Sequence, residues 1–192
     1  MNKKVAIIIT AILCVALICG AFFFASQKNK APSSADGELT EVEKLITKNL
    51  SSDYPATPRE VVKLYNRIIT AYYAEEMSDD ELSDLTSQAL LLFDDELAAI
   101  NPSHDYLVSV KAEISQYKNS SKLISQSNVC DSRDVLYITN NGDEIAYVTA
   151  SYFIKEGNNY SRSYETYVLR KDAEGKWKIL VYYQTQAPTK ED

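Results

Sequence analysis

Histidine, cysteine and glycine are scarce in this sequence, and each shortage excludes a kind of site. The 192 residues include one histidine, three cysteines and five glycines. There is no Cys-x-x-Cys or His-x-x-x-His pair, no glycine-rich phosphate loop and no Gly-x-Ser-x-Gly turn, which excludes dithiol redox sites, zinc ribbons, P-loops and hydrolase elbows. The acidic runs that begin at Asp79 and Asp94 lack the spacing and the glycine of a calcium loop. We therefore expect no cofactor and no bound metal.

Positive charge is scarce outside the N-terminal segment. Residues 1–30 contain four lysines and no acid, whereas residues 31–192 contain 16 Lys and Arg against 27 Asp and Glu, a balance of −11. A body of this charge is repelled by phosphate backbones and by anionic lipid surfaces. The sequence therefore predicts no nucleic-acid partner.

Charged residues are absent from Val5–Ala25, a run of 21 residues. About 20 apolar residues cross a bilayer core as a helix, so this run predicts a transmembrane helix or signal anchor behind the short tail 1–4. A cleavable signal peptide is the alternative, but Phe23 is bulky for the position before the cleavage site. We expect a single-pass protein of the cell membrane that contacts lipid through Val5–Ala25 and holds its C-terminal domain outside the cytoplasm.

The rest of the chain predicts one α+β domain at 39–186, after a flexible linker at 26–38 and before a tail at 187–192. Apolar residues recur at helical spacing over about 39–119. Short β-branched and aromatic runs follow over about 121–186, and they are separated by turn residues such as Asn-Gly. Successive hairpins predict an antiparallel meander, with the helices packed on one of its faces.

Two capping boxes mark helix starts. Thr57 is followed by a proline and by Glu60, and Ser78 is followed by Glu81. The hydroxyl of such a cap accepts from the first-turn amides while the glutamate reaches back to the cap. We expect the helix that begins after Ser78 to continue to Leu97.

Alternation assigns the faces of the strands. Ala146, Val148, Ala150, Tyr152 and Ile154 share one side, and Trp177, Ile179, Val181 and Tyr183 share one side of the last strand. The other side of the sheet is predicted to present an aromatic set that can bind a ligand or a partner: Tyr147, Phe153, Tyr164 and Tyr182. The alternative is that these rings only close the core and cover the sheet.

Three segments carry a resemblance to a known superfamily. They are the helix "PREVVKLYNRIITAYY" at 58–73, the strand "AYVTASYFIK" at 146–155 and the hairpin "LRKDAEGKWKIL" at 169–180. Over about 40–186 the chain resembles the nuclear transport factor 2-like superfamily, in particular its bacterial extracytoplasmic members behind a single N-terminal span. The resemblance implies a cone-like α+β fold with helices on a curved antiparallel sheet. It does not imply one function, because isomerases, dehydratases, ligand binders and scaffolds share this fold.

Enzymes of this cone fold place a carboxylate or a histidine in the pocket for proton transfer. His104, the only histidine, stands beside Asp105 at an expected helix start and is predicted to be exposed. Glu165 is the nearest acidic candidate, and we expect it to be a solvated or rim residue. Cys130, the only cysteine after the apolar run, is expected to be a buried thiol. We therefore predict that no proton-handling group lies inside the pocket.

These observations favour a membrane-anchored, extracytoplasmic, non-catalytic module that binds a ligand or a protein, with a homodimer through the sheet face as a corollary. Two alternatives remain. One is a cone-pocket isomerase or hydratase that uses a single acid or base, and the other is an accessory subunit of an envelope complex.

Overall fold

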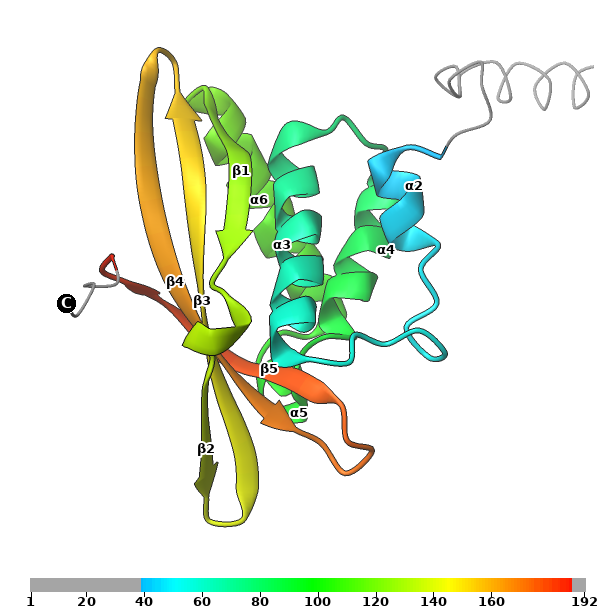
Figure 1. Cartoon of the computed structure of the whole chain (residues 1–192). Coiled ribbons are helices and arrows are strands. Elements are labelled where there is room, and N and C mark those ends of the chain that lie inside the picture. Colours follow the sequence, from blue (N-terminus) through cyan, green and yellow to red (C-terminus); the bar gives the residue numbers. More distant parts are fainter. Residues whose placement is uncertain (1–38, 188–192) are drawn as a thin grey trace, which may run out of the picture. The chain divides into compact units, whose positions relative to one another are not determined.

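The computed structural model describes residues 39–187, and its class is α+β with an antiparallel sheet, as predicted (Figure 1). The helices come first and the strands follow. The helices are α2 Glu41–Ile46, α3 Pro58–Ala74, α4 Asp79–Leu90, α5 Asp95–Ala99 and α6 Ser103–Asn119. The strands are β1 Lys122–Val129, β2 Leu136–Asn140, β3 Asp143–Glu156, β4 Asn159–Lys171 and β5 Trp177–Thr185, and a short 3₁₀ helix, η1 Ser132–Asp134, separates β1 from β2.

The sheet is organised around β3. Its order is β1-β3-β4-β5, all antiparallel neighbours, and β2 also pairs with β3. β1 pairs with the C-terminal half of β3 and β2 with its N-terminal end, so the two short strands lie along one edge of the long strand. The predicted hairpins β2–β3, β3–β4 and β4–β5 are present. Asn141 and Gly142 form the first tip with φ of 52° and 97°, a conformation that asparagine and glycine adopt most readily.

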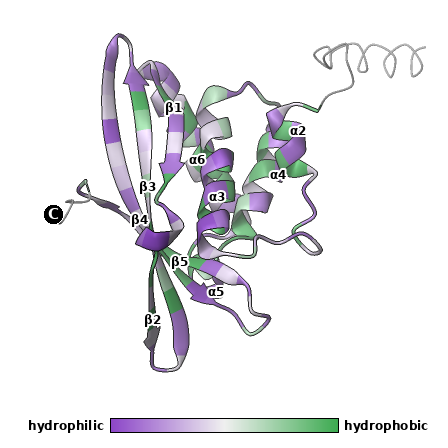
Figure 2. Cartoon of the chain, viewed as in Figure 1, coloured by the Kyte–Doolittle hydropathy of each residue, from purple (hydrophilic) through white to green (hydrophobic). Residues whose placement is uncertain are grey.

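Both predicted capping boxes are confirmed. The Thr57 hydroxyl accepts from the Glu60 amide at the start of α3, and the Ser78 hydroxyl accepts from the Glu81 amide at the start of α4. The main helix, α3, lies against one face of the sheet (Figure 1). It buries Val61, Val62, Tyr65 and Ile68, while hydrophilic residues occupy its other side (Figure 2). Stabilisation comes mainly from this apolar burial, at about 25 cal/mol per Å².

The predicted helix from Ser78 to Leu97 is wrong in its second half. α4 ends at Leu90, and the chain then runs beside β5, where Phe93 forms a parallel bridge with Ile179. The Asp94 amide donates to the Ile179 carbonyl and the Ile179 amide donates to the Leu92 carbonyl, each at 2.8 Å. The free edge of β5 supplies these hydrogen-bonding groups. They would have remained unpaired if α4 had continued to Leu97.

A β-bulge corrects the predicted faces of β5. Val181 pairs with Val168, but Ile179 pairs with Leu169, so Leu180 has no partner on β4. An extra residue reverses the side-chain alternation beyond it. Tyr182 therefore pairs with the buried Tyr167 and lies on the helix-facing side, where the sequence had placed Val181.

The prediction that a transmembrane helix precedes this fold requires a correction. Within residues 39–187 no helix has the length and apolar character needed to cross a membrane. The predicted span Val5–Ala25, the linker 26–38 and most of the tail 187–192 lie outside the described residues.

Candidate functional site

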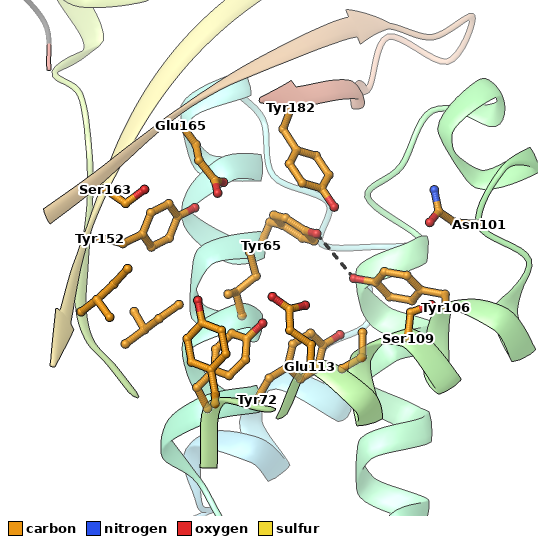
Figure 3. A pocket seen from close by; sticks show the side chains of 16 residues that line it. Tyr65, Tyr72, Asn101, Tyr106, Ser109, Glu113, Tyr152, Ser163, Glu165 and Tyr182 are labelled. Atoms are coloured by element: carbon orange, nitrogen blue, oxygen red, sulfur yellow. Dashed lines mark hydrogen bonds between the residues drawn. The ribbon is translucent and has the colours of Figure 1, made fainter. Parts of the chain in front are cut away.

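A pocket of about 270 Å³ lies between the helices and one end of the sheet (Figure 3). Most of its lining is aromatic or aliphatic, with two serines, one asparagine and two glutamates. Its tyrosines are Tyr65, Tyr72, Tyr73, Tyr106, Tyr117, Tyr152 and Tyr182. Tyrosine combines a rigid apolar ring with a hydroxyl, so this lining presents hydrophobic area and several hydrogen-bonding groups to the same space.

The wall formed by α6 explains why the space is open. This helix buries only Tyr106 and Val110. The residues that face the pocket include Ser109, Glu113 and Tyr117, which recur every four positions and so lie along one side of a helix. This row of side chains lies next to the buried Tyr106 and Val110 and does not pack tightly on the sheet. The space that remains between α6 and the sheet is the pocket.

Glu165 lines this pocket, which corrects the expectation of a solvated rim residue. It is half-buried on β4 and shares the helix-facing side with the buried Tyr167. Its carboxyl group and that of Glu113 point into the pocket from the sheet and from α6 (Figure 3). The prediction that no proton-handling group lies inside is therefore wrong.

The environment of Glu165 favours its protonated form. Burial in the pocket wall raises the pKa of the carboxyl above its ordinary value of 4.5, and the nearby charge of Glu113 adds to the increase. Hydrogen bonds from Tyr167 and Tyr152 oppose the increase in pKa without cancelling it. Desolvation disfavours the charged form of a carboxyl, and a second carboxylate does the same.

Glu165 is the first of four side chains that form a hydrogen-bonded chain into the core. The Tyr167 hydroxyl lies 2.9 Å from Oε2 of Glu165 and contacts the Tyr152 hydroxyl, which donates to Oδ1 of Asn66 at 2.6 Å. Each tyrosine hydroxyl carries one hydrogen, so two hydroxyls supply two of the three hydrogens that these contacts need. The third comes from a protonated Glu165 carboxyl, or from the Asn66 amide nitrogen if the amide is turned over.

The orientation of the Asn66 amide decides which of these two sources supplies the third hydrogen. Its carbonyl oxygen faces Tyr152, and its Nδ2 is buried without a hydrogen-bond partner among the described residues. With this orientation the hydrogen count is complete only when Glu165 is neutral. The same chain accommodates an ionised Glu165 after the Asn66 amide turns over, which also gives Nδ2 a partner.

Tyrosine contacts fix the shape of the other side of the pocket. The Tyr65 and Tyr106 hydroxyls lie 3.4 Å apart, and the rings of Tyr65 and Tyr182 are 5.9 Å apart (Figure 3). Tyr182 also stacks on Tyr167, with ring centroids separated by 5.6 Å. Burial raises the pKa of Tyr106 to about 12, so this phenol is neutral at physiological pH and acts only as a hydrogen-bonding group.

The structure divides the predicted aromatic set between the two faces of the sheet. Tyr182 lies in the pocket. Tyr147, Phe153 and Tyr164 lie on the opposite face, where the Arg162 guanidinium stands 4.3 Å from the centroid of the Phe153 ring. The set therefore does not form one continuous binding surface, and only Tyr182 belongs to the pocket.

The other sequence candidates lie outside the pocket. His104 is exposed in the first turn of α6, as predicted. Cys130 is half-buried rather than buried, and its thiol is free. Burial raises the pKa of that thiol, which makes the reactive thiolate less available. Over residues 39–187 no group of three or more His, Cys, Asp and Glu side chains is arranged to hold a metal ion.

The sequence contains only weak signals for the two pocket glutamates. Glu165 occupies the same side of its strand as Tyr167 and Leu169, an unusual place for an acid in a buried row. Glu113 lies between Ser109 and Tyr117 at four-residue spacing. Neither pattern indicates by itself that the two carboxyl groups meet across one cavity.

Comparison with known sequences identifies a family. Residues 1–182 match the family described as a domain of unknown function (DUF6715), and the match covers most of the chain, so the protein belongs to that family. A comparison with curated proteins found no match.

Proposed function

We propose that this member of the DUF6715 family binds a small molecule in the pocket between its helices and its sheet. The pocket volume of about 270 Å³ carries the proposal, because it is just below the usual range for ligand sites, about 300–1,000 Å³, and so has room for a small ligand. An apolar lining with a few converging polar groups is typical of such sites. Ser109, Glu113, Ser163 and Glu165 supply those polar groups.

A pair of tryptophan variants on α6 tests this proposal. Ser109 lines the pocket and Ser115 does not, and both are exposed. A small-molecule library is screened by ligand-observed NMR against the full-length chain in a non-ionic detergent. Compounds that bind the wild type are expected to bind Ser115→Trp and to lose binding to Ser109→Trp, whose indole fills the pocket. The proposal fails if no compound binds, or if both variants bind every compound equally.

An acid or base catalyst for isomerisation or hydration is the second candidate, and the position of Glu165 favours it. A half-buried carboxyl with a raised pKa meets the requirement for general acid–base chemistry. Compounds that bind the pocket are incubated with the protein and followed by NMR. Turnover that Glu165→Gln abolishes while binding persists would support catalysis, and unchanged compounds would support binding alone.

We also propose that the fold belongs to the nuclear transport factor 2-like superfamily. Helices that precede an antiparallel sheet, pack on one of its faces and leave a pocket at one end support this assignment. An experimental structure superposed on members of that superfamily tests it. A different strand order over the equivalent sheet would remove the assignment.

A further inference from the structure

We propose that the pocket selects a small organic cation, an alkylammonium or quaternary ammonium compound, which the tyrosine rings surround and the carboxyl groups of Glu113 and Glu165 neutralise. The inference rests on the proposed function and specifies the class of ligand. It follows from the chemistry of the lining and from the way its charges are arranged.

The lining carries acids without bases. Two glutamates face the space, and none of the 16 lining residues is a lysine, an arginine or a histidine. The salt bridges of the described residues include neither Glu113 nor Glu165. An anionic ligand would face two carboxyl groups without a counter-charge, whereas a cation would supply the charge that the pocket lacks.

The aromatic rings of the pocket also favour a cationic ligand. A tyrosine ring carries negative charge on its face and attracts a cation placed within about 6 Å of its centroid. Tyr65, Tyr106 and Tyr182 line one side of the pocket, and Tyr73 and Tyr117 stack on the side near Glu113, with ring centroids 4.3 Å apart. Aromatic walls around a carboxyl group recognise ammonium groups in general, because the rings replace water around the alkyl substituents.

Binding of a cation is coupled to the release of a proton. In the empty pocket, burial and the nearby Glu113 raise the pKa of Glu165. A cation favours the carboxylate, so the proton leaves to the buffer and the Asn66 amide turns over to complete the hydrogen bonds. The groups that face Glu165 are Glu113 and Tyr117 of α6, Tyr152 of β3, Tyr167 of β4 and Tyr182 of β5, and α3 adds only neutral side chains to the lining. Since none of these groups is basic, the ligand is the positive charge that drives ionisation.

Choline and its neutral carbon analogue, 3,3-dimethylbutan-1-ol, test the inference because they have the same shape and differ in charge. Isothermal titration calorimetry is run on the full-length chain in a non-ionic detergent, with Glu113→Gln, Glu165→Gln and the control Glu174→Gln. Glu174 is exposed in the β4–β5 turn and loses the same single charge. We expect the wild type and the control to bind choline at least tenfold more tightly than the alcohol, about 1.4 kcal/mol. We expect each pocket variant to lose about tenfold for choline and little for the alcohol.

Titration in buffers with different ionisation enthalpies measures the released proton. Above pH 4.5, where Glu165 of the empty pocket keeps its proton longer than a carboxyl in water, the wild type is expected to release protons on binding choline, and Glu165→Gln is expected to release none. The inference is overturned if the alcohol binds as tightly as choline, or if Glu113→Gln and Glu165→Gln both bind choline like the wild type. It is also overturned if choline does not bind at about 10 mM while library compounds still occupy the pocket. That last result leaves the proposed function intact, whereas a library without any binder removes the proposed function itself.

Discussion

At the scale of single residues, Glu165 sets the charge of the pocket. Its carboxyl is half-buried, faces Glu113 and ends a hydrogen-bonded chain through Tyr167 and Tyr152 to Asn66. Each of these features acts on the same equilibrium, the binding of one proton. The chain offers a complete set of hydrogen bonds in either protonation state, provided that the Asn66 amide can turn over.

The raised pKa of Glu165 predicts how stability depends on pH. A group whose pKa is higher in the folded state stabilises that state fully below its unfolded pKa, and this contribution is lost as pH rises through the folded pKa. We therefore expect the free energy of unfolding of the wild type to decrease, relative to Glu165→Gln, as pH rises above about 4.5. Urea unfolding followed by the fluorescence of Trp177, the only tryptophan, measures the difference.

Glu174→Gln is the matched control for this titration, because it removes a carboxyl that is exposed. Its stability is expected to stay parallel to that of the wild type over the same range of pH. Parallel curves for Glu165→Gln and the wild type would show that folding does not change the proton affinity of Glu165.

At the scale of secondary-structure elements, the junction between α4 and β5 depends on one ion pair. Asp94 is 5% exposed, and its carboxylate accepts two hydrogen bonds from Arg170, at 2.6 and 3.0 Å. The same carboxylate accepts from the Glu96 amide at the start of α5. The pair therefore anchors a five-residue helix to the sheet.

Replacing Asp94 by alanine is expected to destabilise the fold by about 2–4 kcal/mol. The variant loses the cap of α5 and leaves Arg170 with the more exposed Glu96 and Asp143 as its remaining partners. Chemical denaturation measures the loss. Asp95→Ala, at the exposed next position, is expected to change stability by less than about 0.5 kcal/mol. Equal effects of the two variants would contradict the role of the ion pair.

Local signals predicted most of the elements, and tertiary contacts decided the exceptions. Both capping boxes placed their helix starts correctly, since a cap depends on residues three positions apart. The end of α4 at Leu90 depends on hydrogen bonds to Ile179, almost 90 positions away along the chain. No pattern near Leu90 contains that partner, so the apolar periodicity extended the helix too far.

The pocket was predicted less well than the fold, and one residue explains much of the difference. The extra residue Leu180 reverses the alternation of β5 and places Tyr182 inside. A bulge depends on pairing with the neighbouring strand and leaves the alternating pattern of β5 itself unchanged. Glu165 was identified as the nearest candidate for an acid in the pocket. Its burial depends on how α6 packs beside the sheet, and the sequence pattern does not predict that packing.

At the scale of the whole molecule, the outer face of the sheet is the surface where the sequence predicts a homodimer. Tyr147, Phe153 and Tyr164 lie on this face, together with Val181 and Tyr183 beyond the bulge. Val181 and Tyr183 are 43% and 49% exposed. Exposed apolar and aromatic side chains on an open sheet face are suited to burial against a second copy, and the homodimer stays a prediction.

Light scattering coupled to size-exclusion chromatography tests the homodimer on the full-length chain, with the detergent contribution subtracted. The wild type is expected to have the mass of a dimer, and Val181→Glu the mass of a monomer, because a carboxylate at the centre of a dry interface lacks a partner. Val108→Glu is the control, because it is the same substitution at a valine that is 52% exposed on α6 and does not belong to the sheet. A wild type that stays monomeric at high concentration would remove the dimer. A dimer that persists in Val181→Glu would place the contact away from the outer face of the sheet.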